Sequence, residues 1–199
     1  LQMPLGASDI QHIIKNNVFG VDIDEEALEI LRYRLFSTAL YEFSFKLTKK
    51  DLKNFKLGNT ISDDTFLWEK EFGIVFKKGR FDCVVGNPPY KEYTVAKLNY
   101  SLPEYFKTVP VGNLYAPVIE RSICNLVSSR GTIGFIVPIS IVSTPRIYAL
   151  VLRALGNVGR KIGRRNCQIR RERIQRCFGS RNCQNRYWLQ FVGCNGRIT

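Results

Sequence analysis

The sequence of 199 residues predicts an α/β protein built around a parallel sheet. Short apolar runs of strand length, at residues 18–21, 81–86 and 132–137, alternate with stretches of helical periodicity. A polar side chain directly follows each of the first two runs, Asp22 in one case and Asn87 in the other. Because ligands of parallel sheets bind beyond the carboxyl ends of the strands, we expect a site at that edge.

The first predicted strand and helix follow a poorly patterned N-terminal segment, residues 1–17. Residues 18–21 read as a short buried strand. Asp24 is a favourable N-cap because its carboxylate can accept hydrogen bonds from the first turn of a helix. Two glutamates after it favour the positive end of the helix dipole. Three leucines then repeat at helical spacing and are predicted to pack on the sheet: Leu28, Leu31 and Leu35.

The segment between the first two apolar runs is less regular. Residues 46–55 are polar and basic, which predicts a loop or an irregular helix. Residues 55–57 begin a further strand that ends at Gly58 and Asn59. Residues 60–80 read as a loop with a short helix. Asn59 therefore lies at a strand end, as Asp22 does.

The tetrapeptide Asn87-Pro88-Pro89-Tyr90 follows the apolar strand at residues 81–86. Two consecutive prolines are incompatible with the interior of a strand or a helix, so the tetrapeptide forms a rigid loop at the carboxyl end of the strand. A tight turn without a function is the alternative interpretation. The apolar strand before the tetrapeptide and the aromatic side chains after it favour a functional loop.

The region after the tetrapeptide begins with a long loop at residues 91–111 that contains several aromatic side chains. A helix follows and ends at residues 128–131, where Gly131 is a suitable C-terminal stop. Residues 132–137 form the third apolar strand, and another helix begins near Pro145. The apolar stripes of these two helices are Tyr115, Ile119, Ile123 and Leu126, and then Tyr148, Val151, Leu152 and Leu155.

The net charge of +13 indicates a polyanionic partner such as nucleic acid, but the charge is unevenly distributed. Residues 156–199 hold ten arginines, one lysine and one glutamate, a net charge of +10. Residues 1–155 hold 19 basic and 16 acidic side chains, a net charge of only +3. Almost all of the excess therefore lies in the last quarter of the chain.

Two classes of protein are disfavoured by the composition. No apolar run reaches the roughly 18 residues of a membrane-spanning helix, and no secretory signal is recognisable, so we expect a cytoplasmic protein. None of the six cysteines has the C-x-x-C spacing of structural zinc sites, and the single histidine, His12, is far away in sequence. We expect buried or incidental thiols and no metal site.

Four segments resemble one family. Residues 81–90, Phe-Asp-Cys-Val-Val-Gly-Asn-Pro-Pro-Tyr, resemble the catalytic motif of the adenine-N6 DNA methyltransferases, and more narrowly of the large restriction-associated methylases. Residues 18–24 resemble the second cofactor motif of that family. Residues 57–60 with residues 68–72 resemble its third motif region, and residues 113–138 resemble the helix and strand after the catalytic loop.

The resemblance covers about residues 18–155 and implies a partial Rossmann-like methyltransferase sheet with flanking helices. It implies methyl transfer from S-adenosyl-L-methionine to adenine N6 in double-stranded DNA. Asp22 would hydrogen-bond the ribose of the cofactor, and Asn59 would lie near its adenine. Phe19 and Ile23 are candidates for lining the cofactor pocket, the alternative being that both belong to the core. Helix capping is the alternative for Asp22, and a simple turn is the alternative for Asn59.

The catalytic roles in the tetrapeptide follow from the chemistry of adenine. The exocyclic amine is a poor nucleophile because its lone pair is delocalised into the ring. The Asn87 side-chain oxygen and the Pro88 carbonyl can accept hydrogen bonds from both N–H groups and so localise the lone pair. Pro88 and Pro89 hold the acceptors rigidly, and Tyr90 offers a flat face on which an extruded base can stack. Three tyrosines of the following loop either contact DNA or anchor the loop: Tyr93, Tyr100 and Tyr105.

Two departures from the family pattern stand out. The family opens its cofactor site with a glycine-rich loop after its first strand, and residues 1–17 offer only Gly6-Ala7-Ser8, without an apolar strand before it. The expectation is that upstream and downstream portions of a parent methylase are missing. Residues 156–199 form an arginine-rich tail, which is either a basic DNA-binding segment or a disordered or out-of-frame stretch.

Other functions remain open at the level of sequence. A non-catalytic nucleic-acid binder would use the arginine-rich tail, and a decayed fragment would have no activity. Related enzymes with the same tetrapeptide methylate protein glutamine or RNA. The long span between Asp22 and Asn87, together with residues 68–72, favours DNA as the substrate.

Overall fold

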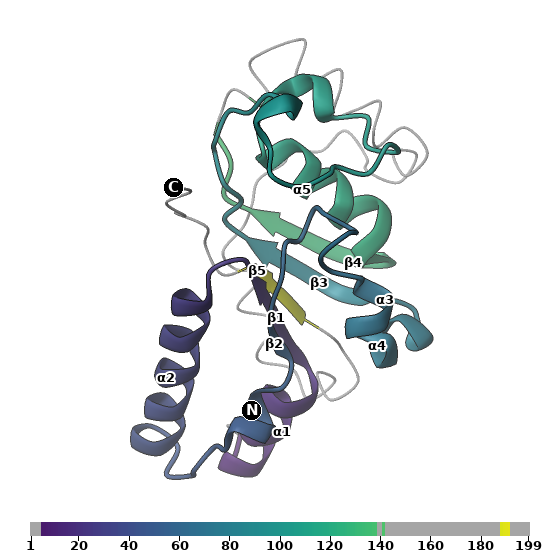
Figure 1. Ribbon diagram of the computed structural model, residues 1–199. Helices are drawn as coiled ribbons and strands as arrows, with labels where there is room; N and C mark the ends of the chain where they lie inside the picture. Colours follow the sequence, from purple (N-terminus) through teal and green to yellow (C-terminus); the bar gives the residue numbers. More distant parts are fainter. Residues whose placement is uncertain (1–4, 139–140, 142–187, 192–199) are drawn as a thin grey trace.

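The structure, a computed structural model, describes residues 5–138, 141 and 188–191 (Figure 1). Its strands form one sheet in the order β2-β1-β5-β3-β4, and every pair of neighbouring strands is parallel. The predicted α/β class and parallel sheet are therefore confirmed. The strands are β1 (Val18–Asp22), β2 (Phe55–Leu57), β3 (Phe81–Gly86), β4 (Val127–Phe135) and β5 (Trp188–Phe191).

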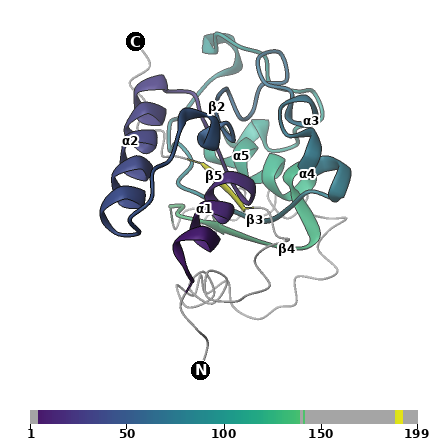
Figure 2. The ribbon, with the colours of Figure 1, turned by 90° about the horizontal axis from the view of Figure 1, so that it is seen from below.

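Helices α1, α2 and α5 are divided between the two halves of the sheet. Helices α1 and α2 contact β1 and β2, whereas α5 lies over β3 and β4, as the two ribbon views show (Figures 1 and 2). The α-helices are α1 (Ala7–Asn16), α2 (Glu25–Tyr41), α3 (Trp68–Glu71), α4 (Gly73–Lys78) and α5 (Tyr115–Arg121). The 3-10 helices are η1 (Lys49–Leu52), η2 (Val95–Lys97) and η3 (Val109–Val111), and η4 (Ser122–Leu126) is a π-helix. None of the helices in these ranges is long and apolar enough to cross a membrane.

Helix α2 begins as the sequence predicts. The Asp24 carboxylate accepts hydrogen bonds from the backbone N–H groups of Glu26 (2.9 Å) and Ala27 (3.4 Å), which confirms Asp24 as the N-cap. Leu28 is fully buried, and Leu31 and Leu35 pack against the same apolar cluster, so the predicted leucine stripe is confirmed. Helix α1 lies in the segment that is poorly patterned in the sequence.

Helix α1 is fastened to the rest of the fold by polar contacts. It buries no residue completely. Lys15 in its last turn forms a 2.8 Å ion pair with Asp51 of η1. The other carboxylate oxygen of Asp51 accepts from the backbone N–H (2.7 Å) and the hydroxyl (2.9 Å) of Thr48. The helix also has an apolar side, because Ile10, Ile13 and Ile14 lie at helical spacing and Ile14 packs against the apolar cluster of Leu28.

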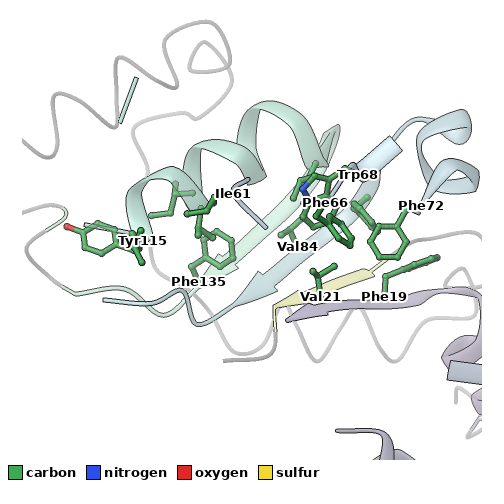
Figure 3. Packing of buried hydrophobic residues seen from close by; sticks show 14 of the residues in the cluster. Phe19, Val21, Ile61, Phe66, Trp68, Phe72, Val84, Tyr115 and Phe135 are labelled. Carbon is green, nitrogen blue, oxygen red and sulfur yellow. The ribbon is translucent and has the colours of Figure 1, made fainter. Parts of the chain in front are cut away.

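A cluster of aromatic rings packs against the sheet and connects β1 with β3 (Figure 3). Phe19 of β1 lies 5.4 Å from Phe72 and 5.6 Å from Phe81 of β3, centroid to centroid, in edge-to-face geometry. Phe66 and Trp68 continue the cluster at 5.0 Å. Such pairs add about 0.5–1.5 kcal/mol each to the gain from burial. Phe19 is thus a core residue, in agreement with the second of its two sequence interpretations.

The boundary between α5 and β4 differs from the prediction. Residues 128–131 do not end a helix, because the strand begins at Val127 and runs through them. The pairing of β3 with β4 shifts register between Phe81↔Val127 and Cys83↔Thr132, so residues 128–131 bulge out of the ladder. A Cβ at Gly131 would lie 2.9 Å from the Asp82 carbonyl oxygen and 2.4 Å from a Val127 methyl carbon. Gly131 therefore permits a close approach of two strands and is not a helix stop.

The long loop between β3 and α5 is anchored by a buried carboxylate. Glu120 of α5 is 4% exposed. Its two oxygens accept hydrogen bonds from the backbone N–H of Lys107 (2.9 Å), the backbone N–H of Thr108 (2.8 Å) and the Thr108 hydroxyl (2.7 Å). Because a buried charge is tolerated only when it is well hydrogen-bonded, these contacts fix the loop against the helix.

The neighbouring Arg121 ties the same loop to the segment after β2. Its guanidinium forms a 2.7 Å ion pair with Asp63 and a short hydrogen bond to the Tyr105 hydroxyl, and it stacks on Phe106. The Tyr105 hydroxyl donates to Asp63 (2.9 Å), and the Tyr93 hydroxyl donates to the Val109 carbonyl (3.2 Å). For Tyr93 and Tyr105 the structure thus favours loop anchoring over DNA contact.

Replacement of Glu120 by glutamine should destabilise the fold. One carboxylate oxygen would become an NH₂ group that faces a backbone N–H. Two buried donors would then lack an acceptor, which lowers the free energy of unfolding by about 2 kcal/mol. Urea unfolding would measure this as a lower free energy of unfolding. The exposed Glu42, at the end of α2, provides the control, because Glu42→Gln should change stability by less than about 0.5 kcal/mol. Equal effects of the two variants would contradict the anchoring role.

The Asp51 carboxylate should make stability depend on acid pH. The Lys15 ammonium and then the Thr48 N–H lower the pKa of Asp51 from 3.8 to about 2. A lowered folded-state pKa stabilises the fold above the unfolded value, and this contribution disappears as the pH falls from about 4 to about 2. The stability difference between the wild type and Asp51→Asn, from urea midpoints, should be constant above pH 4 and shrink towards pH 2. A difference independent of pH would refute the ion pair.

Candidate functional site

The polar residues predicted to converge lie at one edge of the sheet. Asp22 is the last residue of β1, Asn59 lies two residues beyond β2, and Asn87 directly follows β3. Because all strands run in the same direction, these positions share the carboxyl edge. Asp22 and Asn59 lie on neighbouring strands, whereas β5 separates Asp22 from Asn87.

Asp22 is completely buried at the end of β1. One carboxylate oxygen accepts a hydrogen bond from the backbone N–H of Asp24 at 2.9 Å and so holds the turn that leads into α2. The cap of α2 is Asp24, so the capping alternative for Asp22 is wrong. Ile23 between them has 49% of its surface exposed, which excludes the alternative that it belongs to the core.

Asn59 serves a turn. Its side-chain oxygen accepts from the backbone N–H of Ile61 at 3.1 Å, the geometry of an Asx turn. The preceding Gly58 donates its N–H to the Asp22 carbonyl oxygen at 2.8 Å, so this turn is fixed directly beside β1. A Cβ at Gly58 would lie 2.0 Å from the Phe66 ring, so only glycine allows that ring to pack here.

The tetrapeptide 87–90 forms the predicted loop at the end of β3. Pro88 is buried, and Tyr90 is 45% exposed. The Tyr90 hydroxyl oxygen lies 2.7 Å from the Asn87 side-chain oxygen and 2.8 Å from the Ile136 carbonyl oxygen. The Asn113 side-chain N–H donates to the Tyr90 carbonyl at 3.1 Å. Tyr90 is thus held at both its backbone and its hydroxyl.

Two of these partners, Asn113 and Ile136, are absent from the residues that sequence reasoning selected. Asn113 has a weak signal, because it opens the segment after the catalytic loop that resembles the family. Ile136 contributes a backbone carbonyl, which no side-chain pattern reveals. Its N–H donates to the Gly86 carbonyl at 3.1 Å, so the β3–β4 ladder fixes its position.

A cleft of about 920 Å³ opens beside Tyr90, between the loop after β3 and the start of α5. Burial raises the pKa of Tyr93 in its wall to about 12, so this hydroxyl stays protonated at neutral pH. Aromatic faces beside ammonium groups are suited to stacking a base and neutralising a phosphate. Of the aromatic and cationic side chains in the lining, Tyr90, Lys91 and Lys97 are exposed, Tyr93 and Tyr100 are partly buried, and Tyr115 is buried.

Residues 5–138 contain two cysteines, Cys83 and Cys124. Cys83 is buried in β3, and burial raises the pKa of the half-buried Cys124. Within the part of the chain that the structure describes, no group of three or more His, Cys, Asp or Glu side chains lies close enough to hold a metal ion.

Comparison with known proteins agrees with this arrangement. The model of the family described as Eco57I restriction-modification methylase matches residues 16–151, which contain β1 to β4 and the tetrapeptide loop. No curated protein and no solved structure matches the chain. Because the family match covers more than half of the sequence, the chain belongs to the Eco57I restriction-modification methylases, a family of DNA methyltransferases.

Proposed function

We propose that this domain transfers a methyl group from S-adenosyl-L-methionine to the N6 amine of an adenine in double-stranded DNA. The observation that carries the proposal is the loop of residues 87–90, which presents two acceptors and an aromatic face at the carboxyl end of β3. Tyr90 is held by the Ile136 carbonyl, directly after β4, and by the Asn113 side chain, which supports a preorganised loop.

In this proposal the acceptors raise the nucleophilicity of the amine. The Asn87 side-chain oxygen and the Pro88 carbonyl accept hydrogen bonds from its two N–H groups, which localises the nitrogen lone pair for in-line attack. Tyr90 stacks on the base after the base has left the duplex. The cleft beside Tyr90 is large enough for a nucleotide, and Lys91 and Lys97 in its lining can neutralise the adjoining phosphates.

The residues at the ends of β1 and β2 fit a nucleoside cofactor in their chemistry. Asp22 offers a carboxylate for ribose hydroxyls, the exposed Ile23 beside it offers an apolar face, and Asn59 is held next to β1. S-Adenosyl-L-methionine, when bound, would supply an electrophilic methyl group. Because Asp22 is completely buried, a ribose can reach its carboxylate only after the groups that cover it have moved.

The positive net charge supports DNA binding, but most of it lies outside the described residues. Most of the excess positive charge that led to this expectation, +10 of +13, lies in residues 156–199, of which only 188–191 are among the described residues. A Rossmann-like sheet that uses its carboxyl edge for both cofactor and DNA accounts for the positions of Asp22 and Asn87 without the basic side chains of that stretch.

Replacement of Asn87 by alanine should strongly lower the rate of methylation without abolishing it. Loss of one preorganised acceptor costs about 100- to 1,000-fold in kcat. Incorporation of a radiolabelled methyl group into unmethylated genomic DNA would measure this, with digestion to nucleosides to show that the product is N6-methyladenine. Asn16→Ala, on the exposed end of α1, is the matched control and should retain activity. An Asn87 variant as active as this control would refute the proposal, and so would label found only in protein glutamine or in RNA.

Replacement of Asp22 by asparagine should weaken cofactor binding. A hydrogen bond to a charged acceptor contributes about 1.5–3 kcal/mol, so the Kd for S-adenosylhomocysteine should rise roughly 10- to 100-fold. Isothermal titration calorimetry would measure it. Asp24→Asn, in the same turn, is the control and should leave the Kd unchanged, because Asp24 caps α2. Equal Kd values for all three proteins would remove Asp22 from the site.

A further inference from the structure

The Tyr90 hydroxyl lies between two groups that both count as acceptors. Its oxygen is 2.7 Å from the Asn87 side-chain oxygen and 2.8 Å from the Ile136 carbonyl oxygen. A phenol carries one proton and can donate to only one of them. The other contact would then bring two oxygen atoms together without a proton between them, which is unfavourable.

Only one of the two neighbours can change its role. The Ile136 carbonyl can only accept, whereas the Asn87 amide becomes a donor when it turns by half a revolution and exchanges its oxygen and nitrogen. In that orientation the Asn87 N–H donates to the Tyr90 oxygen, and the Tyr90 O–H donates to Ile136. Both contacts of the Tyr90 hydroxyl are then hydrogen bonds with a proton between the two heavy atoms, so this orientation is the favoured one.

We propose that the Tyr90 hydroxyl is a positioning group that fixes the orientation of the Asn87 amide. With its nitrogen held by Tyr90, the amide turns its oxygen away from the phenol and keeps it available to accept from a substrate amine. This inference rests on the proposed function and adds to it a role for the hydroxyl besides stacking by the ring.

The far end of this hydrogen-bond chain is rigid. The N–H of Ile136 donates to the Gly86 carbonyl at 3.1 Å, which continues the pairing of β4 with β3. The carbonyl of Tyr90 accepts from the Asn113 side chain at 3.1 Å. The sheet therefore fixes the Ile136 carbonyl, and the Tyr90 O–H donates to that carbonyl. The Tyr90 oxygen is then left to accept from the Asn87 side-chain nitrogen, which fixes the orientation of the amide.

The opposite orientation would be harmful to the proposed chemistry. An Asn87 NH₂ group that faced the substrate amine would place donors against donors, and the lone pair of the amine would not be localised. Substitution Tyr90→Phe keeps an aromatic ring for stacking and removes this selection. We expect kcat to fall about 5-fold, the size of one neutral hydrogen bond, with KM for DNA unchanged within about 2-fold.

The orientation can be measured without any activity. In the intact ¹⁵N-labelled chain, the Asn87 side-chain NH₂ signals are assigned by their loss in Asn87→Ala. Their exchange with water should accelerate at least 10-fold in Tyr90→Phe, because the donor loses its partner. Tyr105→Phe removes a hydrogen-bonded hydroxyl from the same loop and is the control for general loosening. Unchanged exchange in Tyr90→Phe, or equal acceleration in Tyr105→Phe, would overturn the proposal.

Kinetics separate this role from the proposed function. In an Asn87→Ala background, Tyr90→Phe should cause no further loss of kcat, because the amide it positions is gone. A full additional 5-fold loss would overturn the positioning role. If the wild type does not methylate adenine at all, the proposed function fails, and the amide exchange still decides whether Tyr90 orients Asn87.

Discussion

The parallel alignment of the strands is the constraint on which the rest of the structure depends. It brings the ends of β1, β2, β3 and β4 to the same edge, so that Asp22, Asn87 and the Ile136 carbonyl lie there although they are far apart in sequence. The aromatic cluster holds this alignment from one face, since Phe19 of β1 packs against Phe81 of β3. Because packing of the sheet already fixes where these polar residues lie, few contacts among them are needed to hold the site together.

Features set by local chemistry were predictable from the sequence. The apolar run before the two prolines defines β3 and its loop, and Asp24 followed by two glutamates defines the start of α2. Features set by pairing between distant segments were not. Gly131 looks like a helix stop in the sequence, but in the structure its missing side chain allows β4 to approach β3 closely. Strand β5 lies within the arginine-rich stretch, where the composition gave no reason to expect a central strand.

The candidate site shows the same division. Asn87 and Tyr90 carry recognisable chemistry, and the sequence selected them. The groups that hold them are a backbone carbonyl at Ile136 and an amide at Asn113, and neither has a pattern of its own. The sequence also gave no indication of the contacts among Asp63, Tyr105 and Arg121, because only the fold brings the turn after β2 next to α5. Sequence reasoning thus reached the atoms proposed to touch substrate and missed those that position them.

The place of β5 in the sheet has a consequence for how the chain folds. Val18 of β1 pairs with Trp188, and β3 pairs with the same strand, so the central ladders join segments separated by most of the chain. Contacts of such high sequence separation form slowly, because a long loop has to close first. Until residues 188–191 are in place, β1 and β3 each present an unpaired edge with free N–H and C=O groups. Such edges pair readily with other chains, so the nascent protein passes through a stage in which self-association competes with folding.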